Sequence, residues 1–263
     1  MSIDRSQRLW FDKVAHQYQE ARPAYPQALI EEVLQYSGST AGSRTLEVGC
    51  GPGNATLPFA RCGCAMTCLE PGSSLADLAR EACKAYPNVN VLTCTFEDWT
   101  VEPGAFDLVF SAEAFHWIPP EIAYPKAGVA LKPGGTLALT WILQGDPGAG
   151  LQAAIDAVYR QQSPPLENPD KALDVQWAER QIRDNYHCAG CFTPVAVTRH
   201  AWTVSYTVEQ YLQLFETFSA HAALEPQARL ALFSALRGEI SRFGEPILRR
   251  NEAILFQAKK IPS

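Results

Sequence analysis

The chain has 263 residues, with 22 Lys and Arg against 28 Asp and Glu, which gives a formal net charge of −6. Its 47% of hydrophobic residues can form the core of one α/β domain, and an acidic chain without a basic cluster is a poor partner for nucleic acid. No apolar run is long enough to span a membrane and the polar start is unlike a signal peptide, so we expect a cytoplasmic protein without a membrane partner.

Two helices are predicted near the start of the chain. Apolar residues recur at helical spacing from Leu9 to Tyr18 and again from Leu29 to Leu34. Between them, Arg22 to Pro26 contains two prolines, which end one helix and permit another to begin.

A strand, a glycine turn and a helix are predicted from Arg44 to Arg61. The apolar strand runs into three glycines at alternate positions: Gly49, Gly51 and Gly53. Glycine permits the sharp turn and lets a ligand approach the main chain, and Asn54 is expected to cap the helix that follows. The spacing does not fit the G-x-G-x-x-G loop of dinucleotide-binding folds, because Asn54 or Thr56 occupies the third glycine position.

Four further strands are predicted at residues 64–69, 89–93, 106–110 and 136–141. The first of these ends at Glu70, 21 positions beyond Gly49, and a helix over 75–85 follows it. A carboxylate at the end of this strand can accept hydrogen bonds from both ribose hydroxyls of a nucleoside. The glycine turn Leu131 to Gly135 leads into the last of the four strands.

The pattern is looser from Gly145 to Gly190, where two amphipathic pieces, 151–161 and 177–186, are separated by prolines. The remainder predicts a strand, two helices and a strand, at residues 196–206, 208–223, 226–243 and 247–259. We expect the two strands to pair as an antiparallel hairpin at the edge of the sheet.

The eight cysteines include two clusters, Cys62, Cys64 and Cys68 in one and Cys188 and Cys191 in the other. A zinc site of this spacing needs a second C-x-x-C pair or two spaced histidines, and the first cluster runs into a predicted strand, where neighbours face opposite sides. We therefore expect buried reduced thiols and no metal.

Three motifs carry a resemblance to a known family. The pattern E-x-G-x-G-x-G, from Glu47 to Gly53, resembles the first motif of class I S-adenosylmethionine-dependent methyltransferases. FDKVAHQYQEARPAYP is similar to the amino-terminal cap of small-molecule members, and FDLVFSAEAFHWI to the trans-aconitate methyltransferase-like group. The motifs run from about residue 11 to residue 141, and the resemblance implies a doubly wound, seven-stranded, mostly parallel α/β sheet with a helical cap and insertion.

The resemblance also implies a site for S-adenosylmethionine. In the family the glycine loop wraps the amino-acid and ribose parts, a cap arginine holds the methionyl carboxylate, and the loop after the third strand flanks the adenine. Many members have Asp where this chain has Thr95, with the acid two positions later. The cofactor-binding residues implied are Tyr18, Arg22, Glu47, Gly49, Cys50, Gly51, Gly53, Glu70, Pro71, Thr95, Phe96, Glu97, Ser111 and Trp117. Phe96 could equally pack in the core.

His116 and Glu113 are the candidate catalytic residues. They follow the predicted strand 106–110, and in this fold the carboxyl ends of the strands carry the site. The unperturbed pKa of histidine lies near neutrality, so His116 could take a proton from an alcohol or phenol. A carboxylate acceptor would need no base.

The activity implied is methyl transfer to a small molecule, with O-methylation of a carboxylate or hydroxyl first. Transfer to carbon or nitrogen is the alternative, as is a protein that binds S-adenosylmethionine without catalysis, because fold and cofactor loop do not fix the chemistry. Residues 1–263 are expected to form one domain, a monomer or homodimer: cap 1–36, cofactor core 37–144, substrate lid 145–190 and closing segment 191–263.

Overall fold

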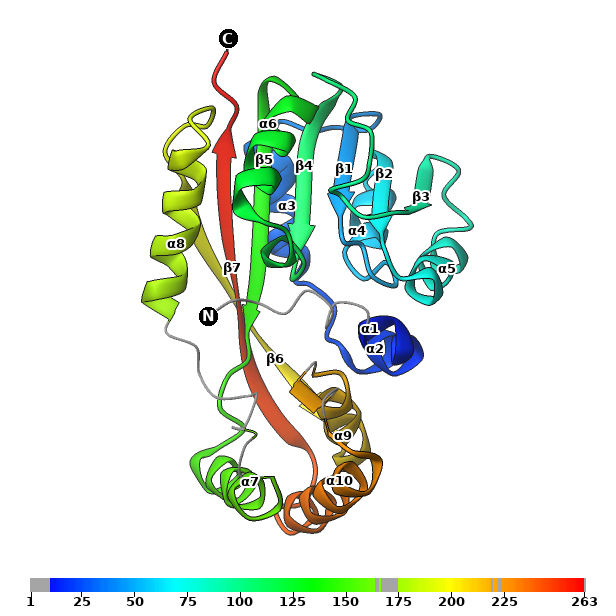
Figure 1. Ribbon diagram of the computed structural model, residues 1–263, viewed down its shortest axis with the longest axis vertical. Coiled ribbons are helices and arrows are strands. Elements are labelled where there is room, and N and C mark those ends of the chain that lie inside the picture. Colours follow the sequence, from blue (N-terminus) through cyan, green and yellow to red (C-terminus); the bar gives the residue numbers. More distant parts are fainter. Residues whose placement is uncertain (1–9, 164–165, 167–174, 219, 222–223, 263) are drawn as a thin grey trace.

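The computed structural model describes residues 10–163, 166, 175–218, 220–221 and 224–262. In this part of the chain seven strands form one sheet, in the order β3-β2-β1-β4-β5-β7-β6 (Figure 1). β1 to β5 are parallel, and β7 is antiparallel to both of its neighbours. This confirms the predicted mostly parallel sheet with an antiparallel pair at its edge. The strands are β1 (Arg44–Val48), β2 (Ala65–Glu70), β3 (Val89–Thr93), β4 (Phe106–Ala112), β5 (Leu131–Leu143), β6 (Ala196–Tyr206) and β7 (Ile247–Lys259).

Helices cover both faces of the sheet. On one face, side chains of α3 (Gln27–Ser37), α4 (Thr56–Arg61) and α5 (Ser73–Ala82) pack in one buried cluster with the strands. On the other face a second cluster joins the strands to α6 (Pro120–Ala130) and α8 (Val175–Cys188). Along β4, Leu108 and Phe110 belong to the first cluster and Phe106 and Val109 to the second, as expected for a strand buried on both faces.

The amino-terminal segment is more broken than its apolar spacing predicts. The first predicted helix divides at Val14 into α1 (Trp10–Lys13) and α2 (Ala15–Ala21). The expected cap by Asn54 is also wrong, because α4 begins at Thr56 with Ala55 at the cap position and no side-chain cap bond. The main chain serves instead, since the Leu57 amide donates to the carbonyl of Gly53.

The long strands β5, β6 and β7 extend past the rest of the sheet (Figure 1). Three helices gather around their far ends: α7 (Ala149–Gln162), α9 (Val208–Glu216) and α10 (Pro226–Ser241). They share a hydrophobic cluster of their own, and we call this unit the arm. α9 ends at Glu216, short of the predicted end at Ala223, which lies outside the described residues.

In the described part of 145–190, a stretch predicted as a substrate lid, two helices lie in different places. α7 belongs to the arm, where it packs against α10. α8 lies along the sheet, and the buried Tyr186 hydroxyl contacts the carbonyl oxygens of Leu137 at 3.2 Å and Phe256 at 3.3 Å. None of the helices in the described ranges is long and apolar enough to cross a lipid bilayer.

Candidate active site

The glycine loop between β1 and α4 requires glycine at its start. Gly49 has a φ of +72°, and a Cβ added there would lie 2.3 Å from the Cβ of Ala114. The amides of Gly49 and Cys50 donate to the Leu69 carbonyl at 2.8 and 3.1 Å, which ties the loop to the end of β2. The loop therefore lies pressed between the ends of β2 and β4.

Glu70 lies at the end of β2 and is 6% exposed. One carboxylate oxygen accepts the amide of Gly51 at 2.9 Å, and the other accepts the amide of Gly72 at 2.9 Å. These two main-chain hydrogen bonds fix the orientation of the carboxylate. Glu70 thus lies beside the glycine loop, and its contact with a ribose stays a prediction.

Glu47 lies one layer deeper, on the strand that leads into the loop. Its Oε2 accepts the Thr56 hydroxyl at 2.6 Å and the Cys68 thiol at 3.6 Å, and it is 1% exposed. Burial raises the pKa of Glu47 to about 7, although these two hydrogen bonds oppose the shift. Its contacts support the turn from β1 into α4.

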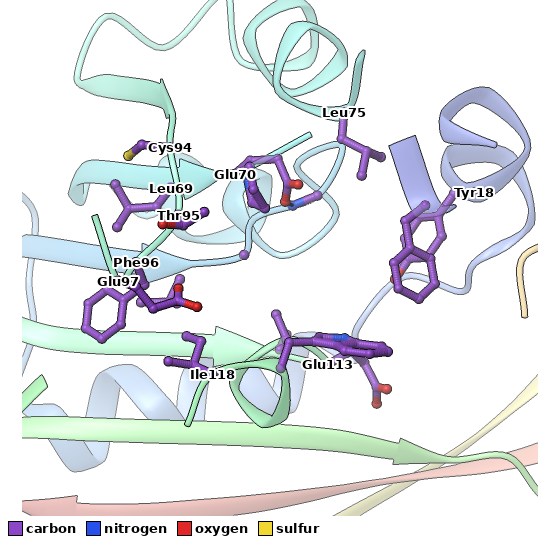
Figure 2. Close-up of a pocket in the computed structure, with 18 residues that line it drawn as sticks. Tyr18, Leu69, Glu70, Leu75, Cys94, Thr95, Phe96, Glu97, Glu113 and Ile118 are labelled. Carbon is purple, nitrogen blue, oxygen red and sulfur yellow. Dashed lines mark hydrogen bonds between the residues drawn. The ribbon is translucent and has the colours of Figure 1, made fainter. Parts of the chain in front are cut away.

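A cavity of about 100 Å³, the loop cavity, lies between the glycine loop and the cap (Figure 2). Glu70 and Pro71 of the β2 end, Thr95 to Glu97 of the β3 end, and Glu113 beyond β4 line it. Tyr18 faces it from α2, and Trp117 completes the wall. The structure thus brings together residues predicted at three strand ends and on the cap.

Residues in the loop after β3 form hydrogen bonds with other groups of the protein. The Thr95 hydroxyl donates to Asp98 at 2.7 Å, and the Glu97 carbonyl accepts Lys126 Nζ at 2.8 Å. Phe96 is 3% exposed and stacks on Trp99 with ring centroids 6.2 Å apart, so it packs in the core and also reaches the cavity wall.

Arg22 contacts residues at the end of α9 in the arm. Its Nε donates to the Thr217 hydroxyl at 3.0 Å, and its guanidinium lies 5.1 Å from the ring centroid of Tyr18 and 5.2 Å from that of Phe218. A second, smaller cavity of about 40 Å³ lies beside it, lined by Glu47, Cys50 and Glu113 among others. Arg22 therefore borders the glycine loop and also fastens the cap to the carboxyl end of α9.

Glu113 stands where the cavities meet. It has a φ of +59°, the one positive value at a non-glycine residue in the described ranges, and such backbone conformations gather at functional sites. Its Oε1 accepts the amide of Ile142. Burial raises the pKa of Glu113, while that amide and the Arg22 charge act in the opposite direction.

A third cavity, the β5 cavity, holds about 650 Å³ and shares Glu113 and Ile118 with the loop cavity. Its walls are mainly apolar and come from β5, β7, α6, α8 and the 3₁₀ turn Phe115–Trp117. His116 lines it from this turn, and Trp141 Nε1 donates to His116 Nδ1 at 3.0 Å. His116 is exposed at the surface of this cavity, and the protein groups packed around its ring desolvate it and lower its pKa to about 4.

Two predicted residues line none of these three cavities. The Ser111 hydroxyl donates to the Val48 carbonyl at 2.7 Å, which links β4 to β1, and Gly53 turns against α5 near Ala79. The sequence prediction in turn missed Trp141, although its position near the carboxyl end of β5 could have suggested it. It also missed the contributions of α8.

The cysteines are free thiols, and four of them are buried: Cys50, Cys64, Cys68 and Cys83. Across the described ranges, no three His, Cys, Asp or Glu side chains are grouped so as to hold a metal ion.

Comparison with known proteins places this geometry among methyltransferases. Residues 45–135 match the family described as a methyltransferase domain. An uncharacterized methyltransferase of Mycobacterium tuberculosis is 31% identical over 137 residues, 52% of this chain and 54% of that protein. A ubiquinone biosynthesis O-methyltransferase of Xanthomonas campestris is 35% identical over 121 residues, 45% of this chain and 50% of the relative. The chain spans about half the length of the curated relatives it matches.

Among solved structures, a putative type II methyltransferase from Anaeromyxobacter dehalogenans superposes with a TM-score of 0.63 at 19% identity, covering 92% of this chain and 99% of that one. Phosphoethanolamine N-methyltransferase 2 of Haemonchus contortus gives a TM-score of 0.55 at 19% identity, over 98% of this chain and 59% of that chain. These likenesses agree with the strand order, and the sequence match covers the glycine loop and Glu70. Residues 45–135 therefore match a methyltransferase domain, and the sheet around them has the fold of solved methyltransferases.

Proposed function

We propose that the protein binds S-adenosylmethionine in the loop cavity and catalyses methyl transfer to a small-molecule acceptor. The observation that carries the proposal is the position of Glu70, whose carboxylate is held by the Gly51 and Gly72 amides at the wall of the loop cavity. Acceptor oxygens at that place suit the two hydroxyls of a ribose. A Haemonchus relative of the same fold is described in complex with S-adenosylhomocysteine.

The residues around the loop cavity fit the parts of this cofactor. At Gly51 nothing lies within 4 Å of the place where a Cβ would stand, which leaves its main chain open to the methionyl part, and Arg22 borders the same loop with a positive charge. Phe96 and Ile118 offer apolar surface for an adenine ring. When bound, the cofactor's sulfonium supplies the methyl group and keeps the electron pair of the carbon–sulfur bond. Alignment of the acceptor by the protein supplies most of the remaining rate enhancement.

The loop cavity is small for this ligand. It holds about 100 Å³, whereas pockets for ligands of this size usually offer roughly 300 Å³ or more. Phe11 and Tyr18 of the cap line the cavity, and their rings meet edge to face at 5.6 Å. We infer that the cap moves outward as the cofactor enters.

Calorimetric titration with S-adenosylmethionine and S-adenosylhomocysteine tests the proposal, with NAD as a control ligand. Each hydrogen bond to a charged group contributes about 1.5–3 kcal/mol, so Glu70→Ala is expected to weaken binding by about 100-fold. Glu121→Ala, a change of an exposed carboxylate on α6 that lines none of the three cavities, is the matched control and should keep wild-type affinity. Wild-type affinity in Glu70→Ala would remove the ribose assignment, and no binding by the wild type would remove the proposal.

A further inference from the structure

The β5 cavity is larger than the loop cavity and adjoins it, so it has room for a second molecule beside the cofactor. The cavities share Glu113 and Ile118, so a molecule in one borders a molecule in the other. Trp141 of β5 and Phe256 of β7 meet edge to face at 5.7 Å on the cavity wall, and Ile182 of α8 also lines it. A volume of about 650 Å³ falls in the range typical of drug-sized ligands.

The charges around this cavity select among acceptors. None of the described residues that line it is Lys or Arg. Its two acids are Glu113 and Glu179, and Glu179 forms an ion pair with Arg199. A carboxylate brought into such surroundings would lose water and gain no counter-ion, which is costly in an apolar site. A neutral acceptor avoids this cost.

The hydrogen bond between Trp141 and His116 fixes which ring nitrogen can act. An indole N–H only donates, so His116 Nδ1 accepts and the proton of the neutral ring is assigned to Nε2. The low pKa of His116 keeps the ring neutral near pH 7. His116, which lines the cavity, therefore carries an N–H donor at Nε2, while its basic nitrogen is occupied. A proton acceptor must come from elsewhere, and Glu113 borders both cavities.

We propose that the β5 cavity is the acceptor site and takes a neutral, mainly apolar molecule that bears a hydroxyl group, a phenol or an alcohol. This inference rests on the methyltransferase activity proposed above. The hydroxyl's O–H bond breaks and its proton passes to the Glu113 carboxylate. The oxygen bonds to the methyl group released by the sulfonium, and the electron pair of the broken carbon–sulfur bond stays on sulfur. The His116 Nε2–H group donates to the same oxygen and orients it.

Binding without cofactor tests the site separately from the reaction. Equilibrium dialysis would compare 4-hexylphenol with 4-hexylbenzoate, which share a tail and differ in charge. Ala178 of α8 lines the cavity, so Ala178→Trp fills it, whereas the exposed Arg180 does not line it and Arg180→Trp is the control. We expect the phenol to bind at least about tenfold more tightly than the benzoate, and to lose about tenfold in Ala178→Trp alone. Equal binding of the two probes, or no effect of Ala178→Trp, would overturn the assignment.

Methyl transfer to 4-hexylphenol tests the role of Glu113. General-base catalysis contributes about 10²–10⁴-fold, so Glu113→Gln should lower kcat by that order and leave phenol binding in dialysis unchanged. His116→Phe should instead raise KM more than it lowers kcat. Calorimetry with S-adenosylmethionine keeps the two proposals apart, since a failed titration removes the activity while dialysis still reports on the cavity. If cofactor and phenol both bind and no methyl ether forms, the assignment of the acceptor is wrong.

Discussion

At the scale of one residue, the buried carboxyl group of Glu47 makes the stability of the folded protein depend on pH. Its pKa in the folded protein is about 7, against 4.5 for the ordinary side chain. Between these values the folded state binds more protons than the unfolded state, so stability falls as the pH rises. The contribution of Glu47 is fully present below about pH 4.5 and is lost as the pH passes through 7.

Glu47→Gln should therefore remove a pH dependence. The amide stays neutral and its oxygen can still accept the Thr56 hydroxyl. We expect the wild type to lose about 2 kcal/mol of unfolding free energy relative to the variant between pH 5 and pH 8. Urea unfolding of both proteins at the two pH values measures this. Parallel stability curves would show that the carboxyl is not buried as described.

Gly49 offers a second residue-scale prediction. Alanine there would adopt φ +72° and place its Cβ 2.3 Å from that of Ala114, whereas at Gly104 it would adopt φ +62° with nothing within 4 Å. Left-handed backbone costs an L residue about 1–2 kcal/mol, and forced overpacking adds about 1–3 kcal/mol. Gly49→Ala should thus destabilise by about 2–5 kcal/mol and Gly104→Ala by only the first amount. Equal losses in chemical denaturation would remove the steric argument.

The positions of several candidate site residues could be predicted at this scale, but their hydrogen-bond partners could not. The spacing of Glu70 from the glycines indicates its place, because the ends of neighbouring parallel strands meet. By contrast, the occupied Nδ1 of His116 depends on Trp141, which is 25 residues away and joins it only through the sheet. The expectation of a histidine base came from an unperturbed pKa, and the fold lowers that pKa to about 4.

At the scale of elements, α1 is fastened to the start of α5. Asp12 Oδ1 accepts the amides of Ser74 and Leu75 at 2.7 and 3.1 Å, so a distant side chain caps α5, whose own cap residue is Gly72. A Cβ on Gly72 would lie 2.7 Å from Asp12 Oδ1, so glycine is what allows the approach. The cap is therefore held against a helix whose first turn also borders the loop cavity.

Asp12→Ala should loosen the cap. Loss of a helix cap costs about 1 kcal/mol, which corresponds to a fivefold change in rate if the contact breaks as the ligand leaves. We expect S-adenosylhomocysteine to dissociate about fivefold faster from Asp12→Ala in stopped-flow chase experiments. Asp12→Asn retains an acceptor oxygen and should lie between the two. An unchanged dissociation rate would mean that ligand release does not require the cap to open.

Over the whole molecule, local periodicity predicted where helices and strands lie in the sequence better than it predicted which elements pack together. The strands were anticipated because glycine or proline stands close to at least one end of each apolar run, and the family resemblance implied a seven-stranded, mostly parallel sheet. The placement of α7 in the arm depends on Ile155 and Leu236, which share a buried cluster although 81 residues apart. The prolines of 145–190 divide it into two pieces, but nothing in that local pattern shows that α7 and α8 pack against different parts of the molecule.

The sheet has one further consequence, for the order in which the molecule can be made. β7 is the last of the seven strands along the chain, yet it lies between β5 and β6. As the polypeptide leaves the ribosome, β6 has no strand to pair with until β7 follows it. Leu139 of β5 and Phe256 of β7 are buried in the same cluster, so this part of the hydrophobic core is also incomplete until β7 has been made. The glycine loop is thus synthesised long before the sheet that supports it is complete.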